Sequence, residues 1–153
     1  MNKTVRIDIS VDDARLISLP SYPTKGFGSL TVAESNADFP LTIKRMFYIY
    51  DIPAGSVRGA HAHYKMNEIL IAASGCFDVE VTDGYRTRIF TLRNPSTALL
   101  LPAGLWRLLN NFSSGCVVLT LCDTDYDESD YIRDYTDYIS LRQPAKNQKN
   151  IRS

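Results

Sequence analysis

The chain has 153 residues, a length that suggests one domain spanning residues 1–153. Apolar residues make up 44% and charged residues 22%, as in ordinary globular proteins. Because 17 basic residues balance 17 acidic ones, the net charge gives no electrostatic reason to expect binding to nucleic acid or to an anionic membrane. The three cysteines form no C-x-x-C pair, and there is neither an apolar leader nor an apolar run of about 18 residues. We therefore expect a cytoplasmic protein without a disulfide framework, a zinc knuckle or a membrane span.

Short alternations of apolar and polar residues, bounded by Gly, Pro, Asp or Asn, predict β-strands along most of the chain. The first covers residues 4–11 and puts Val5, Ile7, Ile9 and Val11 on one face. After a turn-rich stretch at 19–28, further strands are predicted over 28–35, 42–52, 67–74, 76–83, 86–93, 97–103 and 116–123. This number and spacing of short strands indicates a β-sandwich or barrel.

The tail, about residues 125–142, has a different character, being rich in Tyr and Asp. Tyr131, Tyr135 and Tyr138 are spaced i, i+4 and i+7, which predicts a short amphipathic helix. We interpret this tyrosine stripe as a packing face rather than a binding site.

The two histidines of the chain, His61 and His63, are two residues apart in a predicted strand, so both imidazoles point to the same face. The surrounding pattern, G-x5-H-x-H-x4-E-x6-G, resembles the first cupin motif, in which His61, His63 and Glu68 would be metal ligands. Such nitrogen and carboxylate ligands suit Fe(II), Mn, Ni or Zn. The alternative is that the histidines act as an acid and a base, since an imidazole with a pKa near about 6.5 transfers protons readily at neutral pH.

The second cupin motif weighs against a metal. Its Pro102 and Gly104 fit, but Arg107 occupies the position at which a histidine would supply the fourth ligand. An arginine stays protonated and cannot bind a cation, although it can hold an anion or stabilise an oxyanion. A metal-free site is therefore favoured, with a metal held by the two histidines and Glu68 as the open alternative. Without a metal, Glu68 would contact the substrate or orient an imidazole.

Further binding residues are expected on or near the strand that precedes the histidines. Alternation places Tyr48 and Tyr50 on one face, and Arg45 and Arg58 add positive charge. Arginines and tyrosines beside a histidine pair suit a phosphorylated, ring-bearing ligand such as a nucleotide sugar. Trp106 could stack on a base or sugar, but packing in the core is an equally good interpretation.

The stretches RGAHAHYKMNEILIAASG, LPAGLWRLLNNFSSGCVVLTL and DTDYDESDYIRDY resemble the sugar 3,4-ketoisomerases of the cupin superfamily, and the resemblance covers about residues 25–138. It implies an RmlC-like cupin jelly roll with a short C-terminal helix, a homodimer, and no metal or cofactor. The exposed edge of the strand predicted at residues 4–11 is a natural place for strand exchange, so we expect the N-terminal segment, about residues 1–24, to be exchanged between the subunits. The implied substrate is dTDP-4-oxo-6-deoxy-D-glucose, isomerised in the biosynthesis of 3-amino-deoxysugars of surface polysaccharides.

The resemblance also implies roles for individual residues. His63 would be the base at C3 of the sugar, His61 would help to deliver the proton at C4, and Arg58 would lie near the pyrophosphate or sugar. Arg107, together with an aromatic residue near Phe27, goes with the gluco form of the 3-oxo product.

Three other functions remain open from the sequence. They are a dTDP-sugar 3,5-epimerase on the same fold, a metal-dependent cupin enzyme, and a cupin that binds a nucleotide sugar without converting it.

Overall fold

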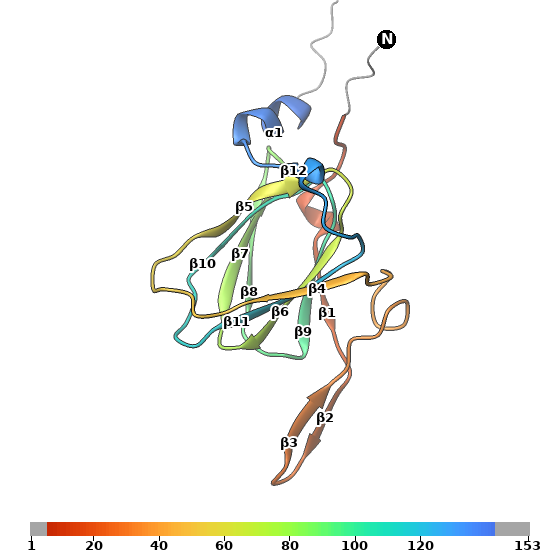
Figure 1. The fold of residues 1–153 in the computed structure, drawn as a ribbon, viewed down its shortest axis with the longest axis vertical. Helices are drawn as coiled ribbons and strands as arrows, with labels where there is room; N and C mark the ends of the chain where they lie inside the picture. The colour runs from red at the N-terminus through yellow and green to blue at the C-terminus, as the bar shows by residue number, and fades with distance from the viewer. Residues whose placement is uncertain (1–5, 143–153) are drawn as a thin grey trace, which may run out of the picture.

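The computed structural model describes residues 6–142, which fold into two five-stranded antiparallel sheets, a two-stranded arm and a short C-terminal helix (Figure 1). One sheet has the strand order β1-β9-β6-β11-β4 and the other the order β12-β5-β10-β7-β8. The predicted all-β jelly roll with a short C-terminal helix is confirmed. The strands and the α-helix are β1 (Arg15–Ser18), β2 (Ser21–Thr24), β3 (Gly28–Thr31), β4 (Arg45–Ile49), β5 (Arg58–His63), β6 (Glu68–Ser74), β7 (Phe77–Thr82), β8 (Thr87–Leu92), β9 (Thr97–Leu101), β10 (Trp106–Asn110), β11 (Val117–Cys122), β12 (Tyr131–Ile132) and α1 (Tyr135–Arg142).

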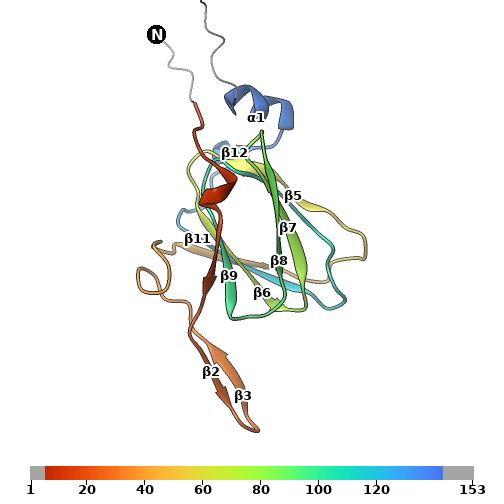
Figure 2. The ribbon, with the colours of Figure 1, turned by 180° about the vertical axis from the view of Figure 1, so that it is seen from behind.

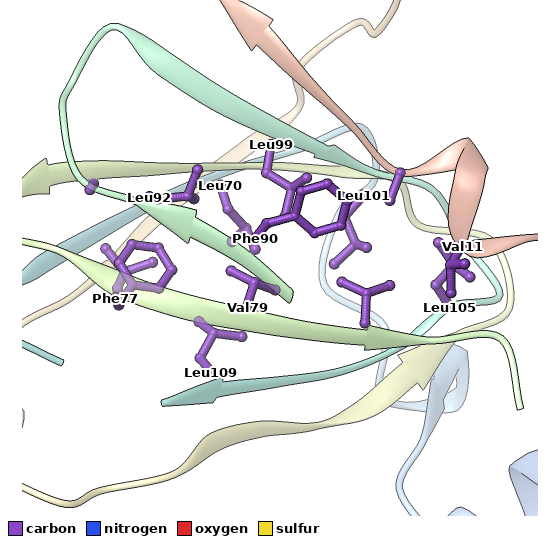
Figure 3. Packing of buried hydrophobic residues seen from close by; sticks show 14 of the residues in the cluster. Val11, Leu70, Phe77, Val79, Phe90, Leu92, Leu99, Leu101, Leu105 and Leu109 are labelled. Atoms are coloured by element: carbon purple, nitrogen blue, oxygen red, sulfur yellow. The ribbon is translucent and has the colours of Figure 1, made fainter. Parts of the chain in front are cut away.

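The main core lies between the two sheets and follows from the period of two along each strand (Figure 3). In β7, Phe77, Val79 and Val81 are buried, whereas the residues between them are only partly so. They face Leu99 and Leu101 of β9, which belong to the same cluster. Burying each such side chain stabilises the fold by about 1.5–3 kcal/mol, so this packing holds the sheets together.

Strand β6 is apolar on both faces. Leu70 and Ala72 point into the main core, while Ile69 and Ile71 belong to a second cluster on the outer side of the sheet. That outer side is covered by the segment between β3 and β4, from which Phe39 contributes a buried ring. This double burial explains why the sequence of β6 reads as a continuous apolar run rather than an alternation.

The strand predicted at residues 4–11 is not formed in its described part, residues 6–11. A 3-10 helix, η1 (Val11–Asp13), begins there instead, and Ser10 caps it. The Ser10 side chain accepts from the backbone N–H of Asp12, and the Asp13 carboxylate accepts from the N–H of Ser10. This capping box satisfies the backbone locally, so the segment gains less from pairing as a strand. Residues 1–5, including Val5, lie outside the described range.

The turn-rich stretch predicted at 19–28 is instead the start of a β-hairpin, β2–β3, which extends from the barrel as an arm (Figures 1 and 2). The short strand β1 was also missed, because its four residues, RLIS, show no apolar alternation and three of them are exposed. The arm carries three large apolar side chains that are more than half exposed: Tyr22, Phe27 and Leu30.

The predicted tail helix is only partly confirmed. Helix α1 begins at Tyr135, whereas Tyr131 lies in β12, which pairs with β5. Tyr138 is fully buried, and its hydroxyl donates a hydrogen bond of 2.9 Å to the carbonyl oxygen of Gly104, so α1 packs firmly against the barrel. The packing interpretation therefore holds for Tyr138 but not for Tyr131. Among residues 6–142, no helix is long and apolar enough to cross a membrane.

Candidate active site

A cavity of about 450 Å³ opens between the two sheets, next to the main core. Strands β4, β5, β6, β10, β11 and β12 contribute its walls, and Leu70 and Leu109 belong both to the core and to the cavity lining. Its size is in the usual range for small-molecule sites. Both histidines line it, so the prediction that they share one cavity is confirmed.

A bulge in β5 determines which of its side chains reach the cavity. Opposite β10, Arg107 pairs with His61 but Leu109 pairs with Arg58, so β5 has one residue more than its partner. Gly59 stands in this bulge with φ +71°, a conformation that side-chain-bearing residues rarely adopt. Because the extra residue reverses the alternation, Arg58 lines the cavity together with the histidines.

The two imidazoles are close and are held in a defined arrangement. Their ring centroids are 4.8 Å apart with the planes at 82°, and the ring of Tyr131 lies 5.0 Å from that of His61 and 4.3 Å from that of His63. Burial, followed by the guanidinium of Arg107, lowers the pKa of His61 to about 3 and that of His63 to about 2. Both imidazoles are therefore neutral near pH 7 and can accept a proton.

Glu68, which the sequence assigned to a metal or to an imidazole, is paired with Arg107 instead. The Nη2 atom of Arg107 lies 3.2 Å from Oε1 of Glu68, and the two side chains are only 1% and 5% exposed. Two donor atoms of this guanidinium, Nε and Nη2, have no hydrogen-bond partner of good geometry within residues 6–142. A buried guanidinium with unused donors in a cavity is suited to stabilise an anionic oxygen.

The donor set does not fit a metal ion. In the part of the chain that the structure describes, no group of three or more His, Cys, Asp or Glu side chains is arranged to hold one. A divalent cation near Glu68 would also lie beside the charge of Arg107, which would repel it.

The tail supplies two cavity residues that the sequence reasoning did not place in the site: Tyr131, which it assigned to packing, and Arg133. Arg133 lies over the Tyr131 ring, 4.2 Å from its centroid, and makes hydrogen bonds of 2.7 and 3.0 Å to the Glu128 carboxylate. With Arg58, it places two exposed cations at the cavity. In the sequence, Tyr131 and Arg133 were marked only by their place in the motif YDESDYIRDY. The spacing of residues in that motif does not predict which side chains line a cavity.

A further tail residue, Asp130, lies behind the histidines. Its Oδ2 atom is 3.3 Å from Nδ1 of His63, and its carboxylate accepts hydrogen bonds from the backbone N–H groups of Lys65 and Met66. Asp130 is the last residue of the 3-10 helix η2 (Glu128–Asp130).

Of the residues predicted on β4, only Arg45 is on the cavity side. It shares a face with Phe47 and Ile49, which line the cavity. Tyr48 and Tyr50 point the other way and are 57% and 58% exposed, with their rings 5.6 Å apart. The alternation was predicted correctly, but which face is inward could not be read from it.

Trp106 and Phe27 also lie away from the cavity of their own chain. Trp106 is 7% exposed and packs against Tyr138, with ring centroids 5.6 Å apart, in the cluster beneath α1. This is the packing alternative stated for it above. Phe27 is 90% exposed in the turn of the β2–β3 arm.

Known proteins of similar sequence indicate the family to which this cavity belongs. A family profile described as FdtA, WxcM-like, C-terminal, matches residues 12–143. The chain belongs to this family. A TDP-4-oxo-6-deoxy-alpha-D-glucose-3,4-oxoisomerase from Aneurinibacillus thermoaerophilus is 38% identical over 111 residues, which are 72% of this chain and 80% of that protein.

Solved structures of family relatives superpose closely on the fold. The sugar 3,4-ketoisomerase QdtA from Thermoanaerobacterium thermosaccharolyticum, in complex with TDP, has a TM-score of 0.82 at 35% identity, covering 85% of this chain and 94% of that one. A 3,4-ketoisomerase from Helicobacter canadensis has a TM-score of 0.81 at 32% identity, covering 84% and 96%. These relatives confirm the predicted cupin fold and the predicted enzyme class, an isomerase.

The epimerase alternative is supported at the level of the fold alone. A 3'-monoepimerase from Streptomyces bikiniensis is 18% identical, with a TM-score of 0.66 and a match covering 77% of this chain and 67% of that one.

Proposed function

We propose that the protein converts dTDP-4-oxo-6-deoxy-D-glucose to a dTDP-3-oxo-6-deoxyhexose by proton transfer through an enediolate. The observation that carries this proposal is a pair of neutral imidazoles in one cavity beside the buried cation Arg107. The similarity to a TDP-4-oxo-6-deoxy-alpha-D-glucose-3,4-oxoisomerase supports the choice of substrate.

In the proposed reaction, His63 removes the proton from C3 of the sugar. The electrons of the C3–H bond form a double bond to C4, and the carbonyl oxygen at C4 becomes an enediolate oxygen. His61 then relays a proton from solvent to C4, and the proton of the C3 hydroxyl passes to the oxygen on C4, so that C3 carries the new carbonyl and C4 a hydroxyl. His63 releases the proton taken from C3 to solvent, and the atoms balance without any oxidant, reductant or metal.

Arg107 has a clear part in this scheme, because negative charge develops on the sugar oxygens as the enediolate forms. A guanidinium already buried within the cavity stabilises that charge without needing to reorganise during the reaction. Arg58 and Arg133, both exposed and lining the cavity, are suited to the pyrophosphate.

For the product, we favour the gluco form at C4, on the basis of Arg107 and the aromatic residue Phe27. Solved relatives include both a TDP-fucose and a TDP-quinovose 3,4-ketoisomerase from Campylobacter jejuni, with TM-scores of 0.80 each. The fold therefore does not separate the two products, and the choice depends on these positions.

The proposed assembly is a homodimer formed through the β2–β3 arm. Tyr22, Phe27 and Leu30 are 60%, 90% and 59% exposed on this arm, which leaves apolar surface for a second copy to cover. Phe27 does not line the cavity that holds the histidines, so a role for it in catalysis requires the neighbouring copy. Light scattering should give twice the chain mass, and replacing Leu30 and Tyr22 by Ser should shift the mass toward that of one chain.

The function is tested by incubating the protein with dTDP-4-oxo-6-deoxy-D-glucose in D2O and examining the product by NMR. The proposal expects a 3-oxo sugar with deuterium at C4. Deuterium at C5 without a 3-oxo product would instead establish an epimerase, and an unchanged substrate that still binds would indicate a binding protein. Loss of the activity on treatment with EDTA would contradict the metal-free scheme.

A further inference from the structure

The carboxylate of Asp130 is fixed in place before any substrate binds. It accepts hydrogen bonds of 2.8 Å from the N–H of Lys65 and 3.1 Å from the N–H of Met66. The backbone carbonyl of the same residue accepts from the N–H of Tyr64, so Asp130 contacts three consecutive residues that follow His63. Being 8% exposed, it is held against the end of β5 and cannot turn freely toward solvent.

This fixed carboxylate lies beside Nδ1 of His63. The distance from Nδ1 to Oδ2 of Asp130 is 3.3 Å, and within residues 6–142 neither ring nitrogen makes a hydrogen bond of good geometry, so Nδ1 has only this carboxylate as a near acceptor while the imidazole lines the cavity. A neutral imidazole carries one N–H, and an ionised carboxylate can only accept. The pair therefore favours the tautomer with its proton on Nδ1, in which Nε2 is a free base.

We propose that Asp130 is a positioning residue that holds His63 in the Nδ1–H tautomer, so that Nε2 takes the proton from the sugar. After this transfer, the carboxylate also stabilises the imidazolium that has formed. The inference rests on the proposed function in one respect, that His63 is the base. The distance of 3.3 Å is long for a hydrogen bond to a charged acceptor, and we expect it to shorten when substrate fills the cavity.

Asp127 provides a matched control for a purely structural role. It caps the same short helix η2, where its carboxylate accepts from the N–H of Ser129 at 2.9 Å and from the hydroxyl of Ser129 at 2.6 Å. It thus supports the same segment but is not paired with a histidine.

The test compares Asp130→Asn with Asp127→Asn by ¹⁵N NMR of the imidazoles and by steady-state kinetics. The chain has only two histidines, so the spectrum of a His61→Asn variant assigns the His63 signals. In the unaltered protein at neutral pH, His63 should show the shifts of the Nδ1–H tautomer. In Asp130→Asn, whose amide can present a donor to Nδ1, the signals should move toward the Nε2–H tautomer. Its kcat should fall by about 10-fold or more with KM changed less than about 3-fold, because the substrate contacts remain.

Three results would overturn the inference. The first is a His63 that is already in the Nε2–H form in the unaltered protein, which can be seen even if Asp130→Asn does not fold. The second is an unchanged tautomer in Asp130→Asn. The third is an equal loss of kcat in Asp127→Asn, which would show that the segment matters only as a scaffold. Since the tautomer is measured without substrate, an absence of ketoisomerase activity would refute the proposed function without affecting this readout.

Discussion

The buried pair Glu68–Arg107 leads to a prediction about stability. The change Glu68→Gln keeps the shape of the side chain and removes only its charge. Arg107, whose side chain is 1% exposed, would then keep its positive charge without a counter-ion. Because removing one partner of a buried pair costs about 3–5 kcal/mol, we expect the free energy of unfolding to fall by about this amount.

The corresponding change in melting temperature follows from the chain length. For 153 residues, an unfolding entropy of about 2.1 cal/mol/K per residue gives about 0.32 kcal/mol/K in total. The predicted loss therefore lowers the melting temperature by about 9–16 °C. Thermal unfolding followed by circular dichroism, together with urea denaturation, measures both quantities.

Two further variants make the measurement specific. Asp12→Asn breaks a surface pair with Arg86, whose atoms are only 2.6 Å apart but whose side chains are 59% and 61% exposed, and it should change the melting temperature little. The double change Glu68→Gln with Arg107→Met removes both charges and should recover much of the stability lost in Glu68→Gln. A melting temperature of Glu68→Gln within about 2 °C of the unaltered protein would refute the argument that the pair is desolvated.

The remaining predictions concern the histidines and the bulge of β5. His63→Asn should abolish turnover while TDP still binds, whereas His61→Asn should slow turnover only partly. Calorimetry measures the binding of TDP and NMR of the product measures turnover. An unchanged rate in His63→Asn would show that His63 is not the base. Because burial and Arg107 lower the pKa of His63 to about 2, kcat/KM should stay level as the pH falls from 8 to about 5, rather than decline below about 6.5 as for an ordinary imidazole. A decline with a midpoint near 6.5 would contradict this. Gly59→Ala should lower the free energy of unfolding by about 1–2 kcal/mol, because alanine is strained at φ +71°. It should also lower kcat, because the new Cβ would lie 3.0 Å from Cδ1 of Leu109 and disturb the bulge. Gly55→Ala is the control, because Gly55 also has a positive φ, +77°, but a Cβ there would have no atom within 4 Å. If both variants changed kcat equally, the bulge of β5 would not be needed for catalysis.

The pairing of Glu68 with Arg107 also explains why a metal-binding pattern persists in a chain whose cavity does not fit a metal. His61 and His63 on β5 and Glu68 at the start of β6 keep the spacing of the motif, and all three line the cavity. At the position of the fourth ligand, a guanidinium supplies the positive charge that a metal ion would otherwise bring. Glu68 then neutralises this guanidinium, as it would a metal ion.

Local patterns in the sequence were sufficient for most of the strands of the barrel, but not for β1, β10 and β12, and they were sufficient for the common direction of the histidine pair. Alternation has a period of two in any strand, so it placed His61 and His63 on one face and Tyr48 and Tyr50 together without knowledge of the fold. It could not say which face of β4 is inward, because that depends on what packs against the strand. The same limit applies to Trp106, whose ring is as suitable for the packing beneath α1 as for a binding site.

Other features depend on contacts between segments that are distant in the chain, and only the tertiary structure decided them. The bulge that turns Arg58 inward arises from a mismatch between β5 and β10, and a single strand does not reveal its register with a partner. Glu68 meets Arg107 because β6 and β10 lie on opposite sheets that face the same cavity. Asp130 reaches His63 because the tail returns to pair with β5, about seventy residues from the histidine motif. The sequence thus determined the side chains available to the site and their local direction, whereas the packing of the sheets decided their partners, because partners are set by proximity in space rather than by spacing along the chain.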